Sequence, residues 1–362
     1  MPLELAIWDS YRLDELDHAP RAADVYERHL RQVERAEELG FGHYYTIEHQ
    51  SSFAGHVSAP TVLLAALSQR TSVIRLGAMI WQLPLHNPVR LAQDIAMLDQ
   101  LSRGRVEFGT GIGVHEHEFL RWNVDFSVRQ EMGEEALEII RTAWTEDEVT
   151  YQGKFWSFDE AIPRPRPYQT PHPPIWAAVH SRRAVEFAAR NGFDVAQNID
   201  TDGDIAEKFA LFDRVHAEHH PGDPTPRKFL MRAVVVAETD EEAHAIAEPC
   251  VREMYGLGRD RMARTRVGIG TGPYLTGPVD REEDRARRQV FAEVARSYDF
   301  ALREGIAIVG SPDSVARQIN EQCTRVGGLD VYCCEFHVGS LEPPLVERSM
   351  ELFGTHVIPA LR

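Results

Sequence analysis

Short apolar runs recur along the chain and alternate with longer segments of helical periodicity. Nearly all of these runs are continuously apolar, which is typical of parallel strands buried on both faces. Because parallel strands need crossover connections, usually helices, the alternation predicts an α/β fold. The eight runs are LELAIW (3–8), HYYTI (43–47), VIRLGAMI (73–80), RVEFGTG (105–111), PIWAAV (174–179), FDVAQNI (193–199), FLMRAVVVA (229–237) and LDVYCCEF (329–336).

The number of these runs favours one α/β architecture over the other. Eight strands with intervening helices match a (β/α)8 barrel. An open doubly wound sheet would more often show about six strands and a glycine-rich first turn, and no such turn follows residues 3–8. Since barrels of this kind fill 362 residues as a single unit, the sequence predicts one (β/α)8 TIM barrel domain over residues 1–362.

Start and stop signals place helices between the predicted strands. Asn87 followed by Pro88 marks a helix start, and Gly104 marks the end of that helix. Ser311 and Pro312 repeat the start signal in GSPDSVARQI. An earlier segment from Asp24 ends at Gly40 and places Val25, Val33, Ala36 and Leu39 on one stripe.

Two insertions interrupt the alternation. Residues 148–174 contain VTYQGKFWSFDE, which indicates a small β-hairpin, followed by the proline-rich AIPRPRPYQTPHPP. This insertion lengthens the connection after the fourth strand. Residues 256–288 are rich in glycine and charge without helical or strand periodicity, so we expect a mobile lid before the last βα unit.

Composition excludes several classes of partner. Fifty-six acidic against 39 basic residues give a formal charge of −17, which would repel a nucleic acid along most of the surface. No window approaches the roughly 18 apolar residues of a membrane span. The start, MPLELAIWDSYRLDE, lacks the basic and apolar regions of a signal peptide, so we expect a cytoplasmic protein. The four cysteines form no CxxC pair, so reduced, mostly buried thiols are expected.

The segment YYTIEHQ, residues 44–50, carries polar residues at the end of an apparent core strand. In barrels of this kind the catalytic residues lie at the carboxyl ends of the strands, which is where Glu48 and His49 fall. Imidazole is the commonest general acid or base, so this position favours catalysis. The alternative is that His49 merely caps the strand end by hydrogen bonding.

Two other segments have competing interpretations. Ser181 opens the helix SRRAVEFAARNG, where a hydroxyl and free N–H groups suit an anion, assisted by Arg182 or Arg183; an ordinary N-cap is the alternative. VHEHEF (114–119) invites a metal hypothesis, but it is not HExxH and it follows a glycine loop. We therefore interpret VHEHEF as a polar loop and predict no metal site.

In sequence order, several segments resemble the bacterial luciferase-like flavin monooxygenases, and among them the luciferase α chain most. The resemblance covers nearly the whole chain. It rests on LGFGHYYTIEH (39–49), LGAMIWQLPLHNPVRLAQDIAMLDQLSRGRVEFG (76–109), WAAVHSRRAVEFAARNG (176–192), VGSPDSVARQI (309–319), GLDVYCCEF (328–336) and LFGTHVIPAL (352–361).

The resemblance implies a (β/α)8 barrel that binds reduced FMN from a separate flavin reductase. Dioxygen then forms a peroxyflavin, which oxygenates a small organic substrate by hydroxylation or Baeyer–Villiger insertion. His49 stands where the family has its catalytic histidine, with Glu48 beside it as the orienting residue. A non-prolyl cis peptide between Met79 and Ile80 is implied under the flavin ring. The implied cofactor-binding residues are Ala78, Met79, Ile80, Thr110, Gly111, Ile112, Val114, Val179, His180, Ser181, Arg182 and Ala184.

The substrate is left open by this comparison. Aromatic residues near the strand ends would either line an apolar pocket or belong to the core; they are Trp8, Phe53, Trp81, Phe119 and Trp122. The family is usually dimeric, so a homodimer is expected, pairing through its first helices.

Three positions depart from the luciferase pattern. Ile112 replaces an arginine that contacts the phosphate, Gly111 replaces a reactive cysteine, and Gln50 replaces the second histidine of an EHH run. These departures argue against light emission and a long-chain aldehyde substrate, and Gln50 is predicted to mark a changed substrate pocket.

Two alternatives to the monooxygenase hypothesis are carried forward. One is hydride transfer with a deazaflavin coenzyme in the same superfamily, which would incorporate no oxygen into the product. The other is a flavin-binding protein without catalysis, against which the presence of His49 and of residues 256–288 argues.

Overall fold

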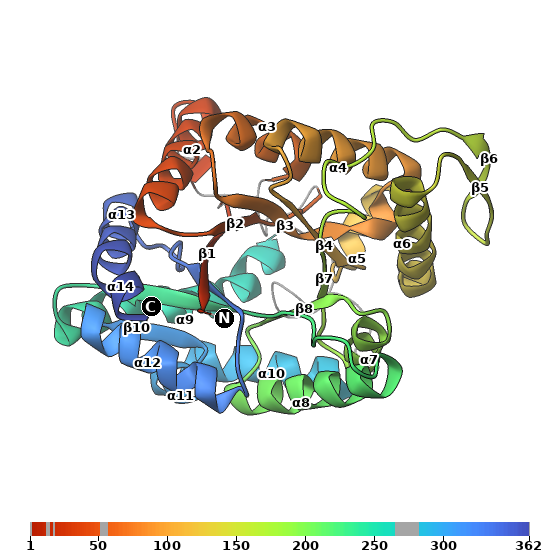
Figure 1. Cartoon of the computed structure of the whole chain (residues 1–362). Helices are drawn as coiled ribbons and strands as arrows, with labels where there is room; N and C mark the ends of the chain where they lie inside the picture. The colour runs from red at the N-terminus through yellow and green to blue at the C-terminus, as the bar shows by residue number, and fades with distance from the viewer. Residues whose placement is uncertain (1, 12–14, 17–18, 51–56, 265–281, 362) are drawn as a thin grey trace. The chain divides into compact units, whose positions relative to one another are not determined.

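The computed structural model describes residues 2–11, 15–16, 19–50, 57–264 and 282–361, with the backbone alone for 256–264 and 282–288. Strands and helices alternate along the described chain (Figure 1). The strands are β1 (Glu4–Asp9), β2 (His43–Thr46), β3 (Arg75–Gln82), β4 (Val106–Gly111), β5 (Val149–Gln152), β6 (Ser157–Ala161), β7 (Ile175–Ala178), β8 (Asp194–Asn198), β9 (Lys228–Val236), β10 (Ala307–Gly310) and β11 (Val331–Glu335). The α-helices are α2 (Ala22–Leu39), α3 (Pro60–Arg70), α4 (Pro88–Ser102), α5 (Glu116–Arg121), α6 (Arg129–Thr145), α7 (Arg182–Arg190), α8 (Asp202–His219), α9 (Asp240–Arg264), α10 (Glu282–Arg296), α11 (Tyr298–Arg303), α12 (Pro312–Arg325), α13 (Pro343–Leu352) and α14 (Ile358–Leu361).

All eight predicted strands are present. Hydrogen bonding orders the main sheet as β10-β9-β11-β1-β2-β3-β4-β7-β8, and a further pairing of β8 with β9 closes it. This is the topology of the predicted (β/α)8 barrel. Strand β10, which pairs in parallel with the second half of β9, was not predicted, because a short apolar run next to a helix start cannot be distinguished from that helix by periodicity.

The described chain divides into two compact units. The first comprises residues 1–9, 35–43 and 177–362, and the second comprises residues 10–34 and 44–176. The prediction of a single domain over 1–362 stays a prediction. In the first unit β9 is the central strand: all nine of its residues are buried, and it pairs in parallel with β8, β10 and β11.

In the second unit β3 and β4 form a parallel pair whose register shifts between Ala78 and Trp81. Trp81 is fully buried and stacks on Phe108 of β4, with 5.3 Å between ring centroids. Helices α4 and α6 pack against each other. The predicted hairpin is confirmed as the antiparallel pair β5–β6.

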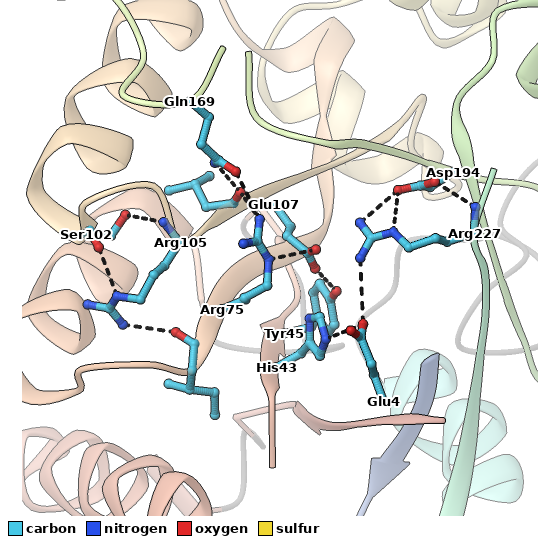
Figure 2. A network of polar contacts seen from close by, with 12 residues as sticks. Glu4, His43, Tyr45, Arg75, Ser102, Arg105, Glu107, Gln169, Asp194 and Arg227 are labelled. Carbon is cyan, nitrogen blue, oxygen red and sulfur yellow. Dashed lines mark hydrogen bonds and ion pairs between the residues drawn. The ribbon is translucent and has the colours of Figure 1, made fainter. Parts of the chain in front are cut away.

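Ionic networks lie at the amino ends of the strands, and Figure 2 shows one in each unit. In the first unit Glu4, at the start of β1, accepts a hydrogen bond from His43 Nε2 at 2.9 Å, and Arg227 pairs with Asp194 at 2.8 Å. In the second, Arg75 donates to the buried Glu107 at 3.0 Å. Polar residues at this end of barrel strands serve stability rather than chemistry.

Predicted helix boundaries are largely confirmed. Asn87 accepts a hydrogen bond from the Arg90 N–H at 3.0 Å, and Gly104 has a φ of 84° just after α4. At α12, Ser311 occupies the N-cap position without a side-chain cap. The carboxylate of Asp240 accepts from the Ser311 N–H at 2.6 Å and from the Ser314 hydroxyl at 2.8 Å instead.

The expectation for residues 256–288 is corrected at both ends. Helix α9 continues to Arg264 and α10 begins at Glu282. The prediction that residues 256–264 and 282–288 are not helical was therefore wrong. Local glycine content does not prevent a helix when neighbouring helices pack on it, as α9 and α10 do. Residues 265–281 of the predicted lid lie outside the described residues. None of the described helices combines the length and apolar character needed to cross a membrane.

Candidate active site

His49 follows strand β2 in the second unit, and its ring is hydrogen-bonded to Glu118. The distance from His49 Nδ1 to Glu118 Oε1 is 2.8 Å; 11% of the His49 side chain is exposed and none of the Glu118 side chain. An ionised carboxylate can only accept, so the hydrogen of the neutral imidazole lies on Nδ1 and the proton-accepting nitrogen is Nε2.

Glu118 is held in place from its other side by Gln82 of β3. The Gln82 Nε2 donates to Glu118 Oε2 at 2.7 Å and to the Glu48 carbonyl at 3.0 Å. Burial alone would raise the pKa of Glu118, but the hydrogen bond from His49, the positive charge that His49 and His115 carry when protonated, and the Gln82 bond lower that pKa to about 2. Glu118 is therefore ionised at neutral pH.

Glu48, the predicted orienting residue, does not face the His49 ring. Its carboxylate accepts from the Gln82 N–H at 2.7 Å, from Gln50 Nε2 at 2.8 Å and from His86 Nε2 at 2.8 Å. Successive side chains of extended backbone point in opposite directions, which separates Glu48 from its sequence neighbour. The assignment of Glu48 as orienter is thus corrected: the carboxylate bonded to His49 is Glu118.

The segment VHEHEF, expected to be a polar loop, enters a helix at Glu116. Helix α5 covers Glu116–Arg121 with His115 at its N-cap position, so His115 and Glu118, three residues apart, lie on one side of a turn. The ring centroids of His49 and His115 are 5.2 Å apart. Burial lowers the pKa of His117 despite the nearby charge of Glu118.

The predicted cis peptide between Met79 and Ile80 is confirmed. It lies where the β3–β4 register shifts, and the facing glycines of β4 allow the close approach. A Cβ on Gly109 would lie 2.2 Å from the Ala78 carbonyl oxygen, and one on Gly111 would lie 2.1 Å from Ile80 Cδ1. Ala78, Met79, Thr110 and Gly111 are therefore part of one tightly packed strand pair, and Ile112 follows it.

The remaining predicted residues of this loop differ in their surroundings. Thr110 is buried, and its hydroxyl donates to the Trp176 carbonyl at 3.1 Å. Ile112 faces Gly133 of α6, where a Cβ would lie 2.7 Å from Ile112 Cγ2. Val114 is exposed.

In the first unit, Ser181 caps helix α7. Its hydroxyl accepts from the Ala184 N–H at 3.2 Å, and it follows the buried Val179 and the half-buried His180. Arg182, predicted to assist anion binding, pairs with Glu186 at 3.0 Å along the exposed side of the helix. Lys208, which was not predicted, has its Nζ 2.6 Å from Asp200 Oδ2, and His180 Nδ1 lies 3.6 Å from the same oxygen.

The candidate pocket residues are mostly packed. Trp81 and Phe119 are fully buried; Phe119 contacts Phe126 edge-on at 5.1 Å. Trp8 is 8% exposed, Trp122 is 50% exposed, and Phe53 lies outside the described residues. Gln50 is buried and its amide also donates to the Ser58 carbonyl at 2.7 Å. Trp81 and Phe119 make packing contacts, and their place in a substrate pocket stays a prediction.

Four residues of the polar cluster were missed as site residues: Gln82, His86, His115 and Glu118. The signal was present for two of them, since VHEHEF stood out as a polar cluster after strand β4. Gln82 and His86 carried none, because Gln82 is the last residue of a core strand and His86 directly precedes the helix-start residues Asn87 and Pro88.

Comparisons with known proteins agree with the fold and the order of motifs. A family model described as luciferase-like monooxygenase matches residues 3–329. Limonene 1,2-monooxygenase of Rhodococcus erythropolis is 25% identical over 340 residues, 91% of this chain and 80% of that protein. The oxygenase component of the flavin-dependent trigonelline monooxygenase of Acinetobacter baylyi is 27% identical over 244 residues, 64% of this chain and 66% of that protein. Among solved structures, monooxygenase RslO1 of Streptomyces bottropensis has a TM-score of 0.79 at 25% identity, covering 99% of this chain and all of that one.

Proposed function

Because the chain belongs to the luciferase-like monooxygenase family, we propose that it is the oxygenase of a two-component flavin-dependent monooxygenase. A separate flavin reductase supplies reduced FMN, and a small organic substrate is oxygenated with dioxygen by hydroxylation or Baeyer–Villiger insertion. The observation that carries the proposal is the hydrogen bond from His49 to the buried Glu118, which prepares one imidazole nitrogen for proton transfer.

The chain's residues fit a bound flavin. The backbone at Ala78, Met79 and Ile80, with its cis bond and facing glycines, is the predicted support for the ring. Reduced flavin, when bound, supplies the electrons that activate dioxygen. Residues 111–114 are the predicted phosphate loop, which Thr110 precedes; since Ile112 brings no charge, the loop would bind phosphate through its backbone N–H groups.

The start of α7 suits a phosphate by itself. Ser181 uses its hydroxyl to cap Ala184, and the first N–H groups of a helix favour an anion. Val179, His180 and Arg182 complete the predicted set there. Lys208 pairs with Asp200, the carboxylate that also lies near His180, and is a further candidate source of positive charge.

His49 is proposed to accept or donate the proton that the oxygenation requires. Glu118 fixes the ring orientation and keeps the hydrogen on Nδ1, so that Nε2 is the reacting nitrogen. Glu48 acts indirectly. It accepts a hydrogen bond from Gln82, and Gln82 donates a hydrogen bond to Glu118.

The test follows reoxidation of reduced FMN by oxygen in a stopped-flow spectrometer, with and without the purified chain. Wild-type protein is expected to introduce a slow, protein-dependent phase that His49→Ala abolishes while still binding reduced FMN. Turnover of a found substrate under labelled dioxygen should place one labelled oxygen in the product. Reoxidation identical to that of free flavin would contradict the proposal. Reaction with a reduced deazaflavin and an unlabelled product would establish the hydride-transfer alternative.

A homodimer is part of the proposal. Apolar side chains are exposed on α3 and α4: Val62 is 71% exposed, Met97 49% and Leu101 47%. Exposed apolar patches commonly mark protein interfaces, so these two helices are the proposed dimer surface.

A further inference from the structure

Three side chains that can ligate a metal converge at the candidate active site. Ligand atoms of His49, His115 and Glu118 all lie within 4.8 Å of one another. The side chain of Glu118 is fully buried, His115 is 1% exposed, and the His49 side chain is 11% exposed. Buried imidazole and carboxylate groups this close differ from the exposed acidic clusters that are common on protein surfaces.

The donor set has a definite chemical preference. Two imidazole nitrogens and one carboxylate oxygen are the ligands of catalytic zinc sites, which leave a fourth position to water. Donor atoms around a tetrahedral zinc ion lie roughly 3.4 Å apart, given bonds of about 2.1 Å. His49 Nδ1 and Glu118 Oε1 are 2.8 Å apart, and all the ligand atoms of the set lie within 4.8 Å of one another, which brackets the spacing that zinc requires.

A second layer of contacts already orients the carboxylate. Gln82 donates to Glu118 Oε2 at 2.7 Å, which leaves Oε1 directed at His49. Gln82 is fixed in turn by Glu48. The Glu48 carboxylate accepts from the backbone N–H of Gln82 at 2.7 Å, and the Glu48 backbone carbonyl accepts from Gln82 Nε2 at 3.0 Å. Outer hydrogen bonds of this kind orient metal ligands and strengthen binding.

We propose that His49, His115 and Glu118 form a binding site for a divalent transition-metal ion of the zinc class, and that metal binding inhibits the enzyme. The ion takes the place of the hydrogen between His49 Nδ1 and Glu118 Oε1, and the neutral ring then carries that hydrogen on Nε2. The nitrogen proposed to accept a proton is thereby blocked. Only the inhibition rests on the proposed function; the binding site does not.

The test is a calorimetric titration of the chelator-treated, flavin-free chain with zinc chloride. One zinc ion per chain is expected. His115→Gln and Glu118→Gln should each raise the dissociation constant for zinc by about tenfold or more. His117→Gln is the matched control: it removes the neighbouring buried imidazole, which is outside the set of three, and should change the affinity by less than about twofold.

Cobalt absorption spectra and crystallography test the metal site without relying on the affinity of any single variant. Cobalt should give the intense visible bands of a tetrahedral site in the wild type and lose them in Glu118→Gln. A crystal grown with zinc should show an anomalous peak between the three side chains. His220→Asn tests an alternative site elsewhere in the chain, since the rings of His216 and His220 stack at 4.9 Å at the end of α8.

Several outcomes would overturn the inference: absence of stoichiometric binding, binding that survives both His115→Gln and Glu118→Gln, or binding lost in His220→Asn. Because these measurements use no flavin, they stand whether or not the monooxygenase proposal holds. Zinc binding without inhibition of a demonstrated oxygenase would retain the site and reject its inhibitory role.

Discussion

Two buried carboxylates near His49 have different tasks. Glu118 accepts from the imidazole itself, while Glu48 accepts from Gln82, Gln50 and His86. The first sets the tautomer of the proposed proton-transfer residue, and the second fixes the amide that positions the first. Adjacency in sequence suggested Glu48 as the partner of His49; the carboxylate that reaches the ring comes from 69 positions further along the chain.

Glu118→Gln tests the positioning role. Glutamine keeps the volume but loses the charge that holds the Nδ1 hydrogen, so the slow phase of FMN reoxidation should shorten by about tenfold, the size typical of lost outer-sphere partners. The affinity for reduced FMN should change by less than about twofold. Glu116→Gln, in the same turn of α5, is the control and should behave as wild type. An equal effect of both substitutions would show that α5 is merely destabilised.

The pair of His86 and Glu48 predicts a pH-dependent stability. Burial lowers the pKa of His86, but the hydrogen bond and charge of Glu48 outweigh it and raise that pKa above 6.5. A histidine whose pKa is higher in the folded state than in the unfolded state stabilises the fold fully at pH values below its unfolded-state pKa. This stabilisation is lost as the pH rises through the folded-state pKa. Urea unfolding of wild type and His86→Gln should therefore show a difference in the free energy of unfolding that is largest at acidic pH and shrinks as the pH rises through the raised folded-state pKa of His86. A pH-independent difference would contradict this assignment.

At the scale of elements, the approach of β3 to β4 determines the shape of the site. The strand pair accommodates the cis bond between Met79 and Ile80 only because Gly109 and Gly111 present no side chain to it. At Gly111 the glycine that replaces the luciferase cysteine thus has a packing role. The obstructing group at Gly109 is a backbone carbonyl, which cannot rotate away as a side-chain end would.

Gly109→Ala is expected to lower the free energy of unfolding by about 2 kcal/mol or more, because overpacking forces backbone shifts. Gly203→Ala is the matched control. Gly203 lies in the first turn of α8, and its nearest neighbour is the Thr201 hydroxyl at 3.9 Å. There alanine should raise stability by about 0.5–1 kcal/mol. Chemical denaturation measures the change in the free energy of unfolding of each variant. A change of the same sign in both variants would refute the packing argument.

The buried ion pair between Arg232 of β9 and Asp202 of α8 joins two elements of the first unit. The Arg232 Nη2 lies 2.9 Å from Asp202 Oδ1, and neither side chain is more than 3% exposed. Asp202→Ala leaves the guanidinium without this partner and should cost about 3–5 kcal/mol. Glu186→Ala, which removes the exposed partner of Arg182, should cost less than about 1 kcal/mol. Thermal or urea unfolding measures both losses of stability. Equal losses in Asp202→Ala and Glu186→Ala would contradict the argument from burial.

At the scale of the whole molecule, the two ends of the strands carry different polar groups. In each unit the amino ends hold ion pairs such as Glu4 with His43 and Arg75 with Glu107 (Figure 2). The polar cluster of His49, Glu118 and Gln82 follows or ends strands at their carboxyl side. This separation is the usual one in barrels, where chemistry and stability occupy opposite ends.

The proposed dimer surface can be tested directly. A double substitution of Met97 and Leu101 by glutamate places charge on the exposed side of α4 and should convert a dimer to a monomer in sedimentation velocity. Leu345→Glu, on the 39% exposed Leu345 of α13, is the control and should leave the dimer intact. A wild-type monomer, or a dimer unaffected by the double substitution, would exclude this surface.

The sequence by itself determined the architecture and the main landmarks. Continuous apolar runs predicted all eight barrel strands, cap residues predicted the starts of α4 and α7, and the family resemblance predicted the cis bond at Met79. These features are encoded locally or in the order of motifs, so they can be read without coordinates. Strand β10 and the helical ends of residues 256–288 escaped because local composition did not reveal their packing.

Only the tertiary structure decided which polar groups meet. The pairing of His49 with Glu118, the bridging role of Gln82 and the approach of His115 join residues from separate elements. The direction of a side chain at a strand end depends on the twist and the bulge of the neighbouring strand, and neither is specified by the residues around His49 alone. The sequence therefore located the candidate histidine, and the fold selected the carboxylate that is hydrogen-bonded to it.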